Sequence, residues 1–227
     1  MNLLAIETAT ESCSVALLAG DRLVARSELA PRRHAELLLP MCEDVLAEAG
    51  LARADLDALA VGRGPGAFTG VRLAISAAQG IALALGIPVV PVSSLAALAM
   101  QAPDDGADVL AVIDARMGEV YAGVYRRAGD RIEAVGAETV GPADALHGRV
   151  SGAVSVIGTG WSSYRDAIEK ALPAPPRWAE GERHPQAADI ARIAAPLAAA
   201  GQGVAAERVL PVYLRDKVAL TLAEQRR

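Results

Sequence analysis

The residues best suited to chemistry lie in a glycine-rich stretch, residues 62–72, which reads GRGPGAFTGVR. It separates a short apolar segment from a long segment rich in alanine and leucine, which predicts a strand, a loop and a helix. Gly64 and Gly66 would let backbone amides approach a phosphate, with Thr69 as the N-cap of the helix. Because no Lys-Ser or Lys-Thr pair closes the loop as in a Walker motif, a tight turn with glycines for close packing is the alternative.

A second polar cluster, ETAT at residues 7–10, lies between two apolar segments near the start of the chain. This pattern predicts a hairpin whose turn carries the polar side chains. Glu7, Thr8 and Thr10 would offer a carboxylate and two hydroxyls to a phosphate or a metal, but a Glu at such a position also caps the turn. DAR at residues 114–116 occupies a similar turn, where it either faces a cleft or combines a turn-stabilising Asp with an exposed Arg.

Histidine and cysteine side chains show no spacing that predicts a metal centre or a nucleophile. His34 and His184 are expected at the surface, and His147 at the end of a helix. Cys13 and Cys42 lie in apolar patterns without an evident His partner, which is typical of small buried hydrophobic residues in a reducing compartment. We therefore expect no metal and no catalytic residue.

Composition excludes several classes of protein. The 227 residues are 52% hydrophobic, which is enough to bury a sizeable core. A net charge of -5 argues against a protein that grips nucleic acid by itself. The opening MNLLAIE lacks the features of a signal peptide, so we expect a cytoplasmic protein. Residues 73–100 are uncharged and long enough to span a bilayer, but Gly80, Gly86, Pro88 and Pro91 interrupt them, which favours a soluble protein.

The order of the predicted elements repeats once along the chain. The first half contains three strands followed by alternating helices and strands, at residues 2–6, 12–18, 22–29, 34–49 (helix), 58–61, 70–85 (helix) and 88–92, with a further helix capped by Ser93 or Ser94 and ending near residue 101. After a linker at residues 102–108, the second half contains strands and then two helices, at residues 109–113, 119–126, 131–135, 155–158, 162–172 (helix) and 186–200 (helix). A Pro-rich loop is expected at residues 173–182, and a short strand or turn at residues 210–214.

This repeat predicts an α/β protein of two lobes with related topology. Residues 1–103 would form the N-terminal lobe, with the glycine loop and partner-binding helices, and residues 104–227 the C-terminal lobe, whose last segment would pack back on the first. The actin, Hsp70 and sugar-kinase (ASKHA) superfamily is built in this way, with nucleotide bound between the lobes.

Five motifs occur in a fixed order over nearly the whole chain: IETATESCSVAL, GRGPGAFTGVRL, IDARMGEVYAGVY, GTGW and LPVYLRDKVA. Together they closely resemble the bacterial TsaB (YeaZ) family. The resemblance implies an accessory subunit for the synthesis of threonylcarbamoyladenosine beside the anticodon of tRNAs that read codons beginning with A. It implies pairing with the catalytic paralogue TsaD, an ATPase, TsaE, that joins the assembly, a homodimer when the chain is alone, and contact with tRNA only through the complex.

The resemblance carries no catalytic residue over to this chain. Active members of the superfamily have an Asp and a Gly ahead of a Thr in the first hairpin, whereas this chain has Glu7 and Ala9, whose methyl group would crowd a phosphate. We therefore expect no cofactor, although weak nucleotide binding between lobes or subunits stays open at the two degenerate phosphate loops. The alternative function is a stand-alone ATP-dependent phosphotransferase or ATPase of the same superfamily.

The predicted helices at residues 34–49 and 70–85 have apolar faces that are wider than a helix needs to pack one side against a core. Such helices lie either at the centre of a large domain or against a partner, and the resemblance implies a helical bundle with the catalytic subunit. The predicted interface residues are Leu37, Leu38, Met41 and Val45 on the first helix, and Arg72, Ile75, Ser76, Gln79 and Leu83 on the second. We expect the Leu37 and Met41 edge to have no burial within its own lobe, so that charging either residue would abolish pairing without unfolding the monomer.

The end of the chain carries a weak basic cluster, Arg215, Lys217, Arg226 and Arg227. Such a cluster is either a solvated tail or a contact for tRNA phosphates within an assembly.

Overall fold

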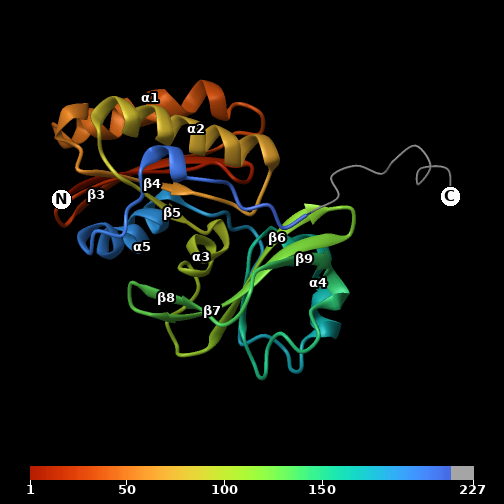
Figure 1. Ribbon diagram of the computed structural model, residues 1–227. Coiled ribbons are helices and arrows are strands. Elements are labelled where there is room, and N and C mark those ends of the chain that lie inside the picture. Colours follow the sequence, from red (N-terminus) through yellow and green to blue (C-terminus); the bar gives the residue numbers. More distant parts are fainter. Residues whose placement is uncertain (216–227) are drawn as a thin grey trace, which may run out of the picture.

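The computed structural model describes residues 1–215, which form two α/β lobes that lie against each other (Figure 1). The described part of the first lobe is built on five strands in the order β3-β2-β1-β4-β5. Their bounds are Asn2–Glu7 for β1, Ser12–Ala19 for β2, Arg22–Leu29 for β3, Ala58–Gly62 for β4 and Val89–Val92 for β5. β1 pairs antiparallel with β2 and parallel with β4.

Helices cover both faces of the first sheet. α1 (His34–Ala49) and α2 (Phe68–Leu85) lie on one face, and α5 (Ala187–Ala199) lies on the other (Figure 1). Side chains alternate along β1 accordingly, because successive residues of a strand point to opposite faces. Leu4 and Ile6 pack in the core with α1 and α2, whereas Leu3 and Ala5 pack in the core with α5.

The second lobe repeats the same strand order. β11-β10-β6-β7-β8 matches β5-β4-β1-β2-β3 in sequence and in strand direction, with β9 as an addition beside β7. The bounds are Asp108–Arg116 for β6, Glu119–Ala128 for β7, Arg131–Ala134 for β8, Thr139–Pro142 for β9, Ser155–Ile157 for β10 and Trp178–Glu180 for β11. α4 (Thr159–Ala171) packs on one face and α3 (Ser94–Ala99) on the other. The two-lobe α/β fold predicted from the sequence is confirmed.

Several predicted boundaries need correction. α2 begins at Phe68 with Ala67 as its N-cap, so Thr69 lies within the first turn and is not the cap. The Pro-rich loop contains β11, because its backbone pairs in parallel with β10. His147 follows a three-residue 3-10 turn, Ala143–Ala145, rather than an α-helix. Residues 210–214 form neither strand nor turn.

The last part of the described chain lies on the first lobe. α5 packs against β1, β2, β4 and β5, and Val209 belongs to the core formed with α1 and α2. The last segment of the unit 104–227 was expected to pack back on the first lobe, and α5 lies on the face of the first sheet that α1 and α2 leave uncovered. Lys217, Arg226 and Arg227 of the basic cluster lie outside the described residues.

α2 is long and apolar enough to cross a membrane by length and composition, and 28% of that window is buried. In this structure, however, the helix packs on β4 and supplies Val71, Ala74 and Ala78 to the core of its lobe. α2 is therefore a helix of the first lobe, and its outer face is largely uncovered.

Candidate functional site

The glycine loop packs against the first hairpin turn of the protein itself. A Cβ added at Gly66 would overlap Ala9 O, and one added at Gly70 would overlap Thr8 O. Hydrogen bonds join the two segments as well: Ala67 N donates to Ala9 O at 2.7 Å, and Thr8 Oγ1 donates to Gly70 O at 2.7 Å. The glycines therefore permit a close approach between two parts of this chain.

These contacts favour the tight-packing alternative over the phosphate cradle. Gly64 has a φ of +89° and its carbonyl accepts a hydrogen bond from Ser94 N at 3.0 Å. Thr69 is exposed and its side chain does not cap α2. A phosphate in this loop would have to displace the first turn, since the turn already occupies the space beside Gly66 and Gly70.

Glu7 ends β1 as a fully buried carboxyl group. Its Oε1 accepts a hydrogen bond from Ala9 N at 2.6 Å, and its Oε2 accepts one from Ser94 Oγ at 2.7 Å. Gly62 leaves room for this group, because a Cβ there would overlap the Glu7 carboxylate. Of the two roles that the sequence allowed, Glu7 takes that of capping the turn.

Burial raises the pKa of Glu7, because desolvation disfavours the charged form, and the hydrogen bonds from Ser94 and Ala9 oppose this only in part. The protonated Glu7 carboxyl therefore stabilises the fold. This stabilisation is fully present below the ordinary pKa of 4.5 and is lost as the pH rises through the raised folded-state pKa. We expect the free energy of unfolding of the wild type to fall relative to that of Glu7→Gln as the pH rises. Urea unfolding of both proteins from about pH 4.5 upward would measure the effect. Parallel pH dependences of the two free energies of unfolding would contradict it.

The cleft between the lobes holds a cavity of about 240 Å³. The first turn and its counterpart in the second lobe face it, together with the start of α2 and the last described residues; its polar lining includes Thr10, Glu11, Asp114, Arg116, Tyr121 and Arg215. Arg116 extends across the cleft and donates to Glu11 Oε1 at 2.5 Å and to Asp114 Oδ2 at 2.9 Å. Asp114 Oδ1 also accepts from Arg116 N at 2.7 Å and from Tyr164 OH at 3.0 Å. Asp114 thus stabilises its turn, and Arg116 links the two lobes.

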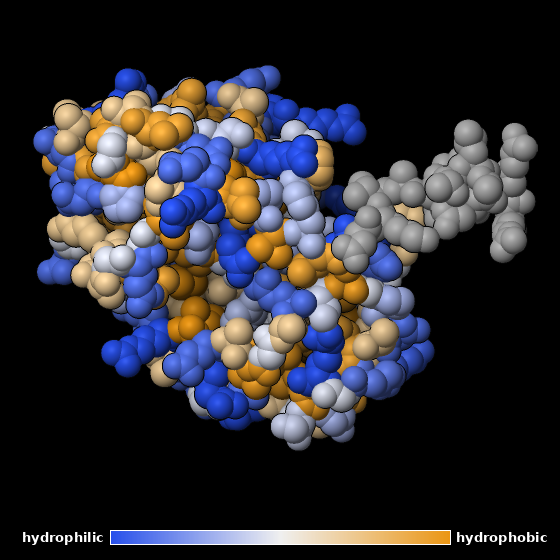
Figure 2. All heavy atoms as spheres, viewed as in Figure 1, coloured by the Kyte–Doolittle hydropathy of each residue, from blue (hydrophilic) through white to orange (hydrophobic). Residues whose placement is uncertain are grey.

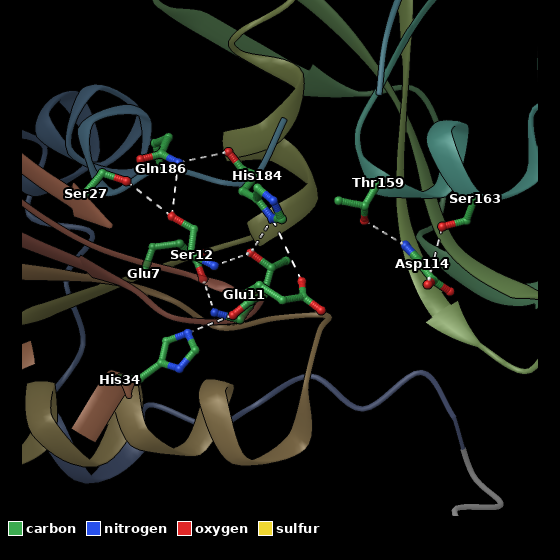
Figure 3. A network of polar contacts seen from close by, with 12 residues as sticks. Glu7, Glu11, Ser12, Ser27, His34, Asp114, Thr159, Ser163, His184 and Gln186 are labelled. Carbon is green, nitrogen blue, oxygen red and sulfur yellow. Dashed lines mark hydrogen bonds and ion pairs between the residues drawn. The ribbon is translucent and has the colours of Figure 1, made fainter. Parts of the chain in front are cut away.

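Two histidines that were expected at the surface, His34 and His184, each contact Thr10. Figure 3 shows both rings near the turn that carries Glu11. His34 Nε2 lies 2.9 Å from Thr10 O, and His184 Nδ1 lies 3.1 Å from Thr10 Oγ1 and 4.0 Å from Glu11 Oε2. Burial lowers the pKa of His184, while Glu11 and Glu182 oppose that shift. Nothing in the local sequence pattern indicates this contact, because His184 and Thr10 are 174 residues apart.

The described polar residues of the cleft form hydrogen bonds and ion pairs with one another, as Arg116 does with Glu11 and Asp114. Among residues 1–215, no group of three or more His, Cys, Asp or Glu side chains is placed to hold a metal ion. Cys13 and Cys42 are buried free thiols, and burial raises their pKa values to about 11 and about 12. Neither thiol therefore has the lowered pKa that activates a nucleophile.

The predicted partner interface is only partly at the surface. Leu38, Met41 and Val45 are buried in the core of their own lobe, and Leu37 is half-buried against it. The expectation of an uncovered Met41 edge is therefore wrong: Met41 is 8% exposed, because the apolar arc of α1 meets both the sheet and the neighbouring α2. A charge at Met41 would disrupt the monomer rather than pairing alone.

On α2 the predicted interface divides in a similar way. Ile75 is buried and Gln79 is half-buried, whereas Arg72, Ser76 and Leu83 are exposed. Three exposed large side chains nearby were not among the predicted interface residues: Leu39, Phe68 and Tyr213, which are 55%, 48% and 47% exposed. A large aromatic residue in the predicted glycine loop, Phe68, was the available signal for this surface.

Two lobes that repeat one strand order around a central cleft define a protein of the actin, Hsp70 and sugar-kinase class. A family model described as "TsaD: tRNA N6-adenosine threonylcarbamoyltransferase" matches residues 26–221. The Escherichia coli (strain K12) tRNA threonylcarbamoyladenosine biosynthesis protein TsaB is 43% identical over 227 residues, with 96% of each chain covered. Its namesake from Haemophilus influenzae is 36% identical over 96% of this chain and 95% of that one.

Solved structures agree with the sequence matches. YeaZ from Pseudomonas aeruginosa has a TM-score of 0.86 and 45% sequence identity, and the match covers 94% of this chain and 99% of that one. The chain therefore belongs to the TsaB (YeaZ) family, and the resemblance inferred from the five motifs is confirmed.

Proposed function

We propose that this chain is a non-catalytic subunit for the synthesis of threonylcarbamoyladenosine in tRNA. Family membership supports a role in this pathway. The relatives from two bacteria are named as threonylcarbamoyladenosine biosynthesis proteins, and each matches this chain over nearly its whole length. The proposed role is to pair with the catalytic paralogue TsaD and to allow the ATPase TsaE to join the assembly. In the absence of the paralogue, the same surface forms a homodimer.

The observation that carries the non-catalytic assignment is the closed glycine loop. In this chain the space beside Gly66 and Gly70 is filled by the first turn, and the Glu7 carboxylate is engaged at both oxygens. A nucleotide phosphate would need both that space and free backbone amides. These contacts support a cleft that holds the lobes together rather than one that binds and turns over ATP.

The outer side of the first lobe supports pairing. Figure 2 shows apolar side chains among polar ones over α1 and α2. Leu39 and Leu83 are 55% and 64% exposed, although both are large aliphatic residues on these helices. Burying such side chains against a partner helix is favourable, and a stable interface would cover roughly 1,200–2,000 Å² in total. With a net charge of -5, the chain would meet tRNA only through the complex.

Reconstitution of the modification with and without this chain tests the proposal. With TsaD, TsaE, tRNA and the remaining components present, we expect threonylcarbamoyladenosine, measured by mass spectrometry of digested tRNA, to depend on this chain. The chain alone should yield no modified nucleoside and no magnesium-dependent hydrolysis of ATP. ATP turnover by the isolated chain, or full modification in its absence, would contradict the proposal.

A further inference from the structure

Residues 209–215, here called the return segment, are anchored to the molecule at both ends. Val209 is fully buried, its carbonyl accepts a hydrogen bond from Gln79 Nε2 at 3.1 Å, and Val212 N donates to Arg63 O at 2.9 Å. At the other end, Arg215 donates to Ala115 O at 3.0 Å and forms an ion pair with Glu119 in the second lobe. The return segment is therefore a fixed part of the folded surface, and displacing it would expose Val209.

The return segment turns its largest apolar side chains outward. Leu210 is 68% exposed and Tyr213 is 47% exposed. Tyr213 stacks on Phe68 with ring centroids 5.7 Å apart, and the Arg72 guanidinium lies 3.7 Å from the Phe68 ring centroid. Arg72 Nε also donates to Tyr213 OH at 2.5 Å. Aromatic and arginine side chains held in this way lose little further entropy on binding, which is why such residues dominate protein interfaces.

A groove of about 480 Å³ runs between α2 and the return segment. α2 supplies one wall and the return segment the other; the lining residues are Arg72, Ile75, Ser76, Gln79, Val209, Leu210, Pro211 and Tyr213. Of these eight, Arg72 carries a charge. The groove therefore fits an apolar protein segment with a carboxylate near one end better than it fits a nucleic acid, which would require several cations.

We propose that the return segment is one wall of the pairing surface and that the groove receives a helix of the TsaD paralogue. This inference rests on the proposed function and names the residues that complete its interface. The family model for TsaD matches residues 26–221 and thus spans α1, α2 and the return segment, so the paralogue is built from corresponding elements. Two chains with corresponding helix faces can pair like with like about an approximate two-fold axis. Leu210 and Tyr213 then enter the interface beside Leu83.

Two variants in the full chain test the proposal, Tyr213→Ala and Leu210→Ser. Each removes an exposed apolar side chain, so the fold should survive, which circular dichroism and thermal unfolding would verify. Met117→Ser is the matched control, because Met117 is 82% exposed on the β6–β7 turn and does not line the groove. By titration calorimetry against purified TsaD, we expect each variant to bind at least about tenfold more weakly, as hot-spot truncations do, and the control to bind as the wild type.

Wild-type affinity in both variants would overturn the proposal. Tighter binding would overturn it too, because the return segment would then cover the surface rather than contribute to it. Weaker self-association with unchanged binding to TsaD would show a second copy as the occupant instead. Leu83→Glu distinguishes failure of this proposal from failure of the proposed function. If Leu83→Glu abolishes pairing while Tyr213→Ala and Leu210→Ser pair normally, the proposed function stands and only the role of the return segment is wrong. Absence of pairing by the wild type would overturn both.

Discussion

Leu83→Glu should abolish pairing with TsaD and with it the tRNA modification. Leu83 is 64% exposed on the outer face of α2, so the monomer tolerates a carboxylate there. In the complex the same carboxylate would lie in an apolar interface without a partner, which costs about 3 kcal/mol or more and corresponds to at least about a hundredfold loss of affinity. Sedimentation of the mixed proteins and the reconstituted modification measure the two consequences.

Met117→Glu provides the control for this change. It introduces the same charge at a side chain that is 82% exposed, but on the second lobe. We expect it to pair and to support modification as the wild type does. If Leu83→Glu also pairs normally, α2 is not the interface, and the proposed mode of pairing is wrong.

The second large effect is expected at Gly70, where a single methyl group should destabilise the fold. A Cβ at this position would overlap the carbonyl oxygen of Thr8, and backbone atoms of the first turn and of α2 cannot yield as a flexible side chain would. Separating the turn from the loop would also break the hydrogen bond from Thr8 Oγ1 to Gly70 O. Gly70→Ala should therefore lower the free energy of unfolding by about 3 kcal/mol or more, measured by urea unfolding.

Gly80→Ala is the matched control because Gly80 lies in the same helix and a Cβ there would meet nothing within 4 Å. Alanine has a higher helix propensity than glycine, so this change should stabilise the protein by roughly 0.5–1 kcal/mol. Opposite signs at two glycines ten residues apart would show that packing against the turn, and not helix propensity, explains the glycine at position 70. Equal effects at the two positions would refute this explanation.

The sequence pattern left open what the glycine loop contacts. A glycine-rich loop between a strand and a helix is compatible with a phosphate cradle and with a tight turn, since both require backbone without side chains. The spacing of Gly64, Gly66 and Gly70 cannot distinguish a ligand from a neighbouring segment. The structure shows that the segment beside Gly66 and Gly70 is the first turn of the same chain.

The sequence by itself determined the local elements and the class of fold. The continuous apolar run of residues 3–6 is typical of a strand buried on both faces, as β1 is. α1 ends where Gly50 adopts a left-handed conformation, with φ of 71°. Ser93 caps α3 by accepting hydrogen bonds from Leu95 N and Ala96 N, as its position suggested. These features depend on neighbours a few residues away, and the repeat of such elements was enough to predict two lobes.

Only the tertiary structure decided which surfaces remain free and which distant groups meet. Met41 lies on a helix with a wide apolar arc, and whether a sheet, a neighbouring helix or a partner covers each part of that arc depends on packing. The contacts of His184 with Thr10 and of Arg116 with Glu11 join residues 174 and 105 positions apart. A local pattern encodes periodicity and caps, whereas contacts at such separations depend on how whole elements pack, so the site and its surface followed from the fold and not from the motifs.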